Sequence, residues 1–245
     1  MSLILLLSAC IPSSLLERHS VELIDFSSNG SLFTLRMTRA NTGILKDQGH
    51  ITLHYYAPNK NPLDFSFHAP ANRVSWKENQ YEIGTQNLQL KENSLEVDAH
   101  FDEFNLRIRG NTQEQDDCSF ESEDWNIRLQ RSKILSQGWL QSNTRSIPLK
   151  GHSFLVSHHG TKSSPISHQQ LFIQSKNMQI FYEDWGDIQF GCVFEGNTVS
   201  TLSADNIHWT ESGAVLRFNG EQINIAWTKR MGRENPYEHI PSFER

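Results

Sequence analysis

The most regular feature of this chain is an alternation of apolar and polar residues. Phe33, Leu35 and Met37 are apolar, and polar side chains separate them. Successive side chains on an extended strand point to opposite faces, so this two-residue period predicts a half-buried β-strand. The same period recurs in the first half of the chain at 51–55, 95–101 and 104–108. Only Asp102 and Glu103 connect the last two segments, which predicts a hairpin there.

Short strands are also predicted throughout the second half, where turn residues such as Asn219 and Gly220 separate the apolar segments. The expected strands are 147–159, 168–174, 178–184, 188–194, 199–203, 207–210, 214–218 and 223–228. No window carries the i, i+3, i+4, i+7 apolar stripe of a long amphipathic helix. The sequence therefore predicts an all-β protein of many short antiparallel strands.

The length of the chain and one polar segment indicate two domains. With 245 residues, the chain can form one large core or two smaller ones. Residues 110–124 are polar and acidic and interrupt the strand pattern, which is typical of a linker. We therefore expect an N-terminal segment, 1–19, followed by two β-barrel or half-barrel domains at 20–124 and 125–245 that pack side by side.

The charge of the chain argues against a nucleic-acid partner. Lys and Arg total 22 against 28 Asp and Glu, a formal net charge of −6, and neither sign forms a long block. Binding to a phosphate backbone depends on clustered basic residues, so no nucleic-acid partner is expected. Aromatic residues make up 10% of the chain, which is typical of a packed globular protein.

The N-terminal sequence MSLILLLSAC allows two interpretations. Leu7, Ser8, Ala9 and Cys10 resemble the lipobox of bacterial lipoproteins, which predicts lipidation of Cys10 and a lipid-anchored periplasmic protein in the bacterial envelope. The apolar run is short for a signal peptide, however, and no Lys or Arg precedes it. The alternative is an ordinary terminal segment of a cytoplasmic protein. No stretch of about 20 apolar residues is present to span a bilayer.

Two further cysteines, Cys118 and Cys192, lie one in each half of the chain. In an oxidising compartment they could form a disulfide, whereas in the cytosol two isolated cysteines are more often free and buried. The sequence leaves both alternatives open.

Two longer stretches carry a family resemblance. The first, YEIGTQNLQLKENSLEVDAHFDEFNLRIRGN, is a strand entry and hairpin ending near Gly110, and the second, GWLQSNTRSIPLKGHSFLVSHHGTKSSPISHQQLFIQ, begins at Gly138. Their spacing resembles the two-domain lipocalin-like superfamily of survival-factor proteins and hydroxyneurosporene synthase, or carotenoid hydratase, proteins. The resemblance covers roughly Glu22 to Trp227. It implies two lipocalin-like β-domains that bind an elongated apolar molecule, such as a lipid or polyene.

The resemblance leaves the activity open. Hydratase-type relatives have an acidic residue and a histidine followed by an aromatic residue and glycine, where this chain reads Ser157, His158, His159 and Gly160. Survival-factor relatives carry a histidine where this chain has Val156. We therefore expect binding, with or without transport, of a lipid or other elongated hydrophobic molecule. The alternatives are a hydratase, dehydratase or cyclase acting on a polyene or isoprenoid lipid, and a structural protein with filled barrels.

Four of the 11 histidines fall within residues 151–169. On a strand, His152 and His158 share a face but lie about 20 Å apart, too far to bind one metal ion, and His159 points to the opposite face. His168 could meet either of the adjacent histidines across a hairpin, but two histidines without a carboxylate or thiolate make a weak metal site. No metal or other cofactor is expected. The imidazoles either bind backbone groups at strand ends or lie at a cavity mouth, where they could bind a headgroup or donate a proton.

The segment FYEDWGD, 181–187, is a second candidate for acid chemistry. If Phe181 and Trp185 point inward, Glu183 lies buried between them, and burial raises the pKa of a carboxyl group. If they point outward, Glu183 and Asp187 only end a hairpin, and this second interpretation is favoured.

No nucleophile elbow, phosphate-binding loop, dinucleotide fingerprint or His-Glu-x-x-His metal motif occurs in the sequence. The expected partner is a hydrophobic small molecule or lipid, with membrane contact only through the anchor at Cys10 and with the oligomeric state undefined. The candidate catalytic residues are His158, His159 and Glu183, and the candidate ligand-binding residues are His152, Phe154, Val156, His168, Tyr182 and Trp185.

Overall fold

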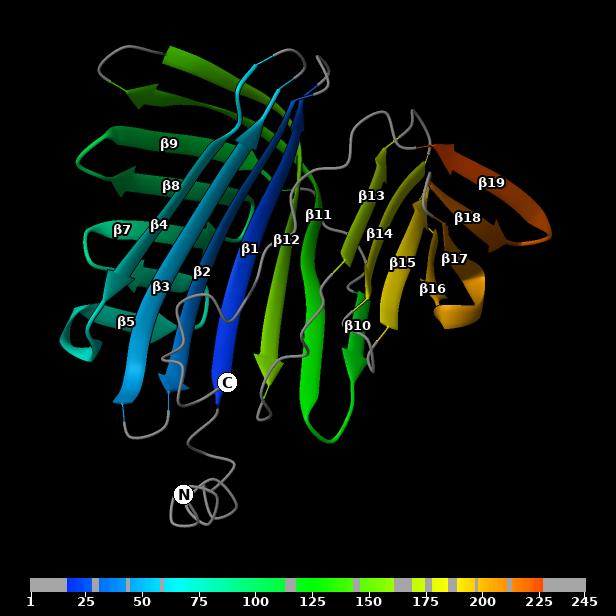
Figure 1. Cartoon of the computed structure of the whole chain (residues 1–245), viewed down its shortest axis with the longest axis horizontal. Coiled ribbons are helices and arrows are strands. Elements are labelled where there is room, and N and C mark those ends of the chain that lie inside the picture. The colour runs from blue at the N-terminus through cyan, green and yellow to red at the C-terminus, as the bar shows by residue number, and fades with distance from the viewer. Residues whose placement is uncertain are drawn as a thin grey trace, which may run out of the picture. The chain divides into compact units, whose positions relative to one another are not determined.

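A computed structural model of the chain is shown in Figure 1. It describes residues 17–27, 31–42, 45–57, 60–112, 118–142, 146–160, 169–174, 178–184, 189–196, 198–210 and 213–226. All regular structure in these ranges is β-strand apart from two single turns of 3₁₀-helix, so the all-β prediction is confirmed. The chain divides into two compact units, Met1–Lys162 and Ser163–Arg245.

The first unit contains one large antiparallel sheet. Its strands are β1 (Arg18–Ser27), β2 (Leu32–Thr42), β3 (Leu45–Tyr56), β4 (Leu63–Ala69), β5 (Val74–Lys77), β6 (Gln80–Ile83), β7 (Gln86–Lys91), β8 (Ser94–His100), β9 (Phe104–Asn111), β10 (Cys118–Glu121), β11 (Trp125–Ser142) and β12 (Ser146–Gly160). They lie in the order β4-β3-β2-β1-β12-β11-β9-β8-β7-β6-β5, with β10 paired to β11 beside this path.

This sheet curls back on itself into a nearly closed barrel. Its two edge strands, β4 and β5, follow each other in the chain and are connected only by Pro70 and the 3₁₀ turn Ala71–Arg73. A Cβ atom at Gly49 on β3 would lie 2.7 Å from side-chain atoms of Val74 and Ile83, which shows how closely β3 approaches β5 and β6. Figure 1 shows the strands β5–β9 crossing behind β1–β4.

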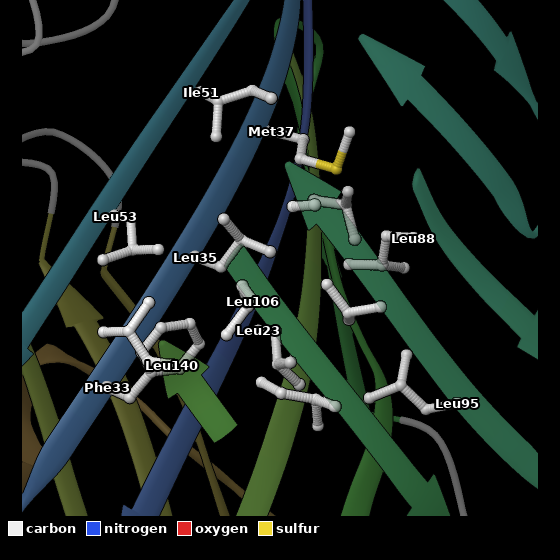
Figure 2. Packing of buried hydrophobic residues seen from close by; sticks show 14 of the residues in the cluster. Leu23, Phe33, Leu35, Met37, Ile51, Leu53, Leu88, Leu95, Leu106 and Leu140 are labelled. Atoms are coloured by element: carbon white, nitrogen blue, oxygen red, sulfur yellow. The ribbon is translucent and has the colours of Figure 1, made fainter. Parts of the chain in front are cut away.

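The space between these two layers is filled by apolar side chains. Figure 2 shows residues of β1–β3, such as Leu23 and Phe33, gathered with residues of β7–β9, such as Leu88 and Leu106. Each of the four is at most 1% exposed. Full burial of side chains of this size stabilises the fold by about 1.5–3 kcal/mol each, before the loss of conformational entropy. We call the face of the sheet that carries these residues the inner face, and the opposite one the outer face.

Strand β11 changes partners along its length. Its first part pairs with β10, its last part, Leu135–Ser142, pairs with β9, and β12 accompanies both parts. The β11–β12 register shifts between Leu129 and Arg131 and again between Arg131 and Ile134. Extra residues of this kind bend a strand and increase its twist, which is how one strand can turn from one layer into the other.

These pairings correct the expected linker and place the division of the chain elsewhere. The polar segment 110–124 contains the end of β9 and all of β10, so its residues 110–111 and 118–121 belong to the sheet. The division falls after Lys162 instead of after Asp124, because β11 and β12 pair with β9 and β1 of the first unit.

The second unit consists of two small antiparallel sheets. One has the order β13-β14-β15-β16 and the other β17-β18-β19, and a second barrel is not seen among the described residues. The strands are β13 (Gln169–Gln174), β14 (Met178–Asp184), β15 (Gln189–Glu195), β16 (Thr198–Leu202), β17 (Ile207–Thr210), β18 (Gly213–Phe218) and β19 (Glu221–Ala226). Their positions agree with the sequence prediction to within two residues. They share a core that includes Ile180, Tyr182, Val193 and Leu216.

Gly138 provides a test of the link between the two layers of the first unit. A Cβ atom there would lie 2.0 Å from the Arg107 carbonyl oxygen and 2.8 Å from the Ile108 Cα atom, both backbone atoms of β9. Gly138→Ala must therefore push β9 away from β11, and we expect it to lower the free energy of unfolding by about 1–3 kcal/mol or more. The exposed neighbour Gln137 serves as the control, since Gln137→Ala adds no atom. Urea unfolding followed by tryptophan fluorescence measures both, and equal midpoints would contradict the close approach.

Candidate functional site

Strand β12 carries most of the histidines that the sequence singles out. It runs without interruption between β1 and β11, and its side chains alternate as expected. Leu155 belongs to the core of the first unit, so Phe154, Val156 and His158 lie on the outer face. These three are nevertheless buried, with exposed fractions of 0%, 0% and 3%. The outer face at this point is thus enclosed within the folded chain.

Four polar side chains lie together on this enclosed face, and we call them the outer-face cluster: Ser20, Glu22, Arg36 and His158. All four are at most 5% exposed. The Ser20 hydroxyl lies 3.3 Å from Nδ1 of His158, directly opposite it across the β1–β12 ladder. Arg36 donates two hydrogen bonds to Oε2 of Glu22, from Nη2 at 2.7 Å and from Nε at 3.2 Å.

The register places the two pairs next to each other. Glu22 stands opposite Val156, two residues along from the Ser20–His158 pair. Diagonal neighbours of this kind in an antiparallel sheet lie about 7–8 Å apart. The acidic group that the sequence around His158 lacks is therefore supplied by β1, from a position that local sequence reasoning did not consider.

Apolar side chains surround the outer-face cluster on the same face. Ile24, Phe154, Val156 and Ile127 are each 0% exposed. Ile127 lies directly opposite His158 on β11. A buried apolar surface with a few polar groups held at defined positions is the usual composition of a small-molecule site.

A second buried polar group lies on the inner face, at Asp25. Ser153 donates a hydrogen bond of 2.6 Å to Oδ2 of Asp25, and Ser136 donates to the same oxygen. All three side chains are at most 4% exposed. Burial raises the pKa of the Asp25 carboxyl group, and the hydrogen bonds from Ser136 and Ser153 oppose this shift. Sequence reasoning missed this group because it did not identify β1 as a strand.

The structure also corrects the expectation for Glu183. Glu183 and Phe181 lie on the same face of β14 and both are 0% exposed, so Glu183 is not the exposed end of a hairpin. Gln170 of the neighbouring strand donates a hydrogen bond of 2.6 Å to Oε1 of Glu183. The buried alternative that the sequence left open is the one that the structure shows.

Tyr182 points the other way, into the core of the second unit. Burial, assisted by the charge of Asp184, raises the pKa of Tyr182 to about 12. Its hydroxyl finds no hydrogen-bond partner in the described part of the chain. Its phenol is therefore protonated at neutral pH and packs near the ring of Trp209. This placement favours a structural role over ligand binding.

Of the remaining candidates, His152 and His159 lie in the described part of the chain and three others lie outside it. His152 is half-buried on the outer face, and His159 is exposed on the inner face. His159 stacks on His19, and these two imidazoles and the Glu17 carboxylate form a group that could hold a metal ion. Cys10, His168 and Trp185 lie outside the described residues.

Cys118 and Cys192 are both buried and both disulfide-bonded. The oxidised alternative that the sequence left open for these cysteines therefore holds. Where the chain is described, it contains no helix with the length and hydropathy needed to cross a bilayer.

The first unit is thus a nearly closed antiparallel β-barrel whose outer face is buried along β1 and β12. No protein-family model and no curated protein matches the sequence. Solved structures do match. An AttH-type protein of Nitrosomonas europaea aligns with a TM-score of 0.59 at 9% identity, covering 82% of this chain and 76% of that one.

Two further structures extend this comparison. Kievitone hydratase from Nectria haematococca aligns with a TM-score of 0.53 at 9% identity, over 87% of this chain and 76% of the hydratase. CghA, solved with Sch210972, aligns with a TM-score of 0.56 at 6% identity, over 75% of this chain but only 59% of CghA. At these identities the likeness concerns the fold, and it confirms the resemblance expected from the sequence.

The pair Glu22–Arg36 is expected to be strongly coupled. Removing one partner takes the opposite charge away from a buried ion, which typically costs about 3–5 kcal/mol, whereas replacing both by apolar residues costs far less. We expect Arg36→Met to destabilise the chain by that amount and Glu22→Leu/Arg36→Met to recover most of the loss. The control is Lys91→Met, which breaks the exposed pair Lys91–Glu96 and should cost less than about 1 kcal/mol. Urea unfolding measures the cycle, and a double variant as unstable as Arg36→Met contradicts the coupling.

Asp25 predicts a pH dependence of stability with a defined sign. Its pKa is higher in the folded than in the unfolded chain, so the folded state binds more protons once the pH exceeds the ordinary value of 3.8. The free energy of unfolding contributed by Asp25 therefore falls as the pH rises from that value through the folded-state pKa. Asp25→Asn removes this loss, so the stability of the variant relative to wild type should rise as the pH increases from 3.8 through the folded-state pKa of Asp25. Urea midpoints at a series of pH values above 3.8 test this, with Asp102→Asn as an exposed control, and a difference between Asp25→Asn and wild type that does not change with pH would contradict it.

Proposed function

We propose that this protein binds a hydrophobic small molecule against the enclosed outer face of β1, β2 and β12 and transfers a proton to or from it. The observation that carries the proposal is the buried imidazole of His158 beside the buried Glu22–Arg36 pair on an otherwise apolar surface. Keeping ionisable groups out of water costs free energy, so fold stability alone does not account for their placement. Buried ionisable groups are concentrated at functional sites.

The contacts suggest a role for each side chain. Ser20 holds Nδ1 of His158 and thereby orients the ring, so we assign proton exchange with the ligand to Nε2. Glu22 and Arg36 form a fixed charged pair that can position water or a polar group of the ligand. In a hydration, the imidazolium gives its proton to one alkene carbon, water adds to the other carbon, and the proton released by that water returns to the imidazole.

The fold comparisons support a reaction of the hydratase or cyclase type over binding alone. Kievitone hydratase is named for a hydration, and CghA was solved with a bound small molecule, Sch210972. Both share the fold of this chain, although fold alone does not fix function. We propose by analogy that the ligand here is an unsaturated compound, such as a polyene or isoprenoid lipid.

We also propose that the second unit is a lipocalin-like domain. The hydratase alignment covers 87% of this chain, which is more than the first unit contains, so it extends into the second. Lipid anchoring at Cys10 and a location in the bacterial envelope remain predictions from the sequence.

The proposal predicts a specific defect for His158→Gln. The chain, purified from its own host, is examined by native mass spectrometry and organic extraction for a co-purifying ligand. A lipid extract of the host is then incubated with the protein in ¹⁸O-labelled water to detect labelled products, and in D₂O to detect cyclised products that have gained deuterium. General acid–base catalysis contributes about 10²–10⁴-fold, so His158→Gln should lower turnover by that factor while the ligand still binds. His50→Gln, on the same face but on β3, is the matched control and should leave turnover unchanged.

The outcomes separate the alternatives. If the wild-type protein binds a ligand without turnover, it is a carrier, which is the function that the sequence alone favours. Absence of any bound ligand, together with no binding of the fluorescent polyene cis-parinaric acid, would contradict the proposal and favour a structural protein.

A further inference from the structure

We propose that Glu17, His19 and His159 form a binding site for a divalent transition-metal ion of the zinc class. The site lies on the inner face, where β1 begins and β12 ends. The outer-face cluster lies on the opposite face of the same strands, so the metal site does not depend on the proposed function. Sequence reasoning expected no metal here because it considered only histidines within residues 151–169.

The strand register brings the two imidazoles together. His19 stands directly opposite His159 in the β1–β12 ladder. The rings are stacked with their centroids 4.1 Å apart and their planes 10° from parallel. Both rings direct Nε2 toward the same carboxylate oxygen, Oε1 of Glu17, at 2.7 Å from His19 and 3.4 Å from His159.

The third ligand is held by the backbone of the neighbouring strand. The amide of Asn41 on β2 donates a hydrogen bond of 2.8 Å to the Glu17 carbonyl oxygen, which fixes Glu17 just before β1. One atom from each of the three side chains lies within 4.8 Å of the other two. A tetrahedral ion with bonds of about 2 Å needs ligand atoms about 3.3 Å apart, so small side-chain rotations complete the geometry. These side chains are 24–46% exposed and have room for such rotations.

The donor atoms select the kind of ion. Two imidazole nitrogens and one carboxylate oxygen suit zinc, cobalt, nickel or copper better than magnesium or calcium, which prefer oxygen ligands. Three protein ligands leave a fourth position for water or a ligand atom, as in catalytic zinc sites. Each bound imidazole would then carry its proton on Nδ1.

The charges nearby are compatible with a cation, because the site carries the Glu17 carboxylate between its two imidazoles. Arg39, opposite His19 on β2, is the nearby positive charge, and it forms an ion pair of 2.7 Å with Asp47.

The chain contains a matched control for this arrangement. His50 and His68 also stand directly opposite each other, on β3 and β4. Their rings are stacked at 4.2 Å with an interplanar angle of 12°. They belong to no group of three potential ligands within the described residues. The two pairs therefore differ mainly in the carboxylate that completes the first one.

The test uses the full chain without a histidine tag, stripped of metal with EDTA. Calorimetric titration with Zn²⁺ should show one site per chain, and Co²⁺ should produce the visible absorption of a four- or five-coordinate ion, whereas Mg²⁺ should not bind. Loss of a group that merely supports a metal ligand costs about 10–100-fold in affinity, so Glu17→Gln, His19→Gln and His159→Gln should each cost at least about tenfold. His50→Gln and His68→Gln should leave the affinity unchanged.

Urea midpoints without metal show that the variants are folded, and the exposed side chain of His159 makes His159→Gln the safest of them. Zn²⁺ should also raise the melting temperature of wild type but not of His159→Gln, since a ligand stabilises only the state that binds it. Zinc affinity that His159→Gln leaves intact, or that His50→Gln abolishes, would overturn the proposal. Failure of wild type to bind Zn²⁺ would overturn it as well, without affecting the test of His158.

Discussion

The antiparallel register of β1 and β12 is the constraint on which both candidate sites depend. The two strands pair without a shift from Arg18 opposite Gly160 to Ser27 opposite Gly151. Because side chains alternate between faces, this single register places His19 beside His159 on one face and Ser20 beside His158 on the other. A slip of one residue would exchange the faces and dismantle both groups together. Two adjacent histidines in the sequence therefore belong to two chemically separate sites.

The register itself is secured by burial on both faces. On the inner face, Val21 and Leu23 pack into the core of the first unit, and on the outer face Ile24 and Phe154 are fully buried. A slip of one residue would exchange the two faces and would bring the buried polar groups of each face among the wrong neighbours. The buried pair Glu22–Arg36 acts in the same way on the neighbouring β1–β2 register, where the two residues stand directly opposite each other. Polar groups in the interior thus define the alignment as much as they stabilise it.

The sequence predicts strands well where only one face is buried. Strand β9 alternates strictly between buried and exposed residues, and its position follows directly from the pattern. Strand β1 was missed because it carries apolar residues on both faces, which removes the two-residue period. Strand β11 was missed because polar residues dominate it and it changes partners. The faces of β12 could be predicted, but the partners of its histidines could not. Ser20 lies 138 residues from His158, and pairing over such distances leaves no local signal.

The two register shifts in β11 have a consequence for how this protein can vary. Each shift adds one residue to β11 relative to β12, and between Leu129 and Ile134 the two together add two. The first extra residue alone would exchange the two faces for all of β11 that follows it. The second extra residue restores the original faces. Leu129 therefore keeps its place on the outer face, and Ile134 lies in the inner core. Insertions and deletions at this bend can preserve the fold in pairs but not singly, so homologous chains should differ here by even numbers of residues.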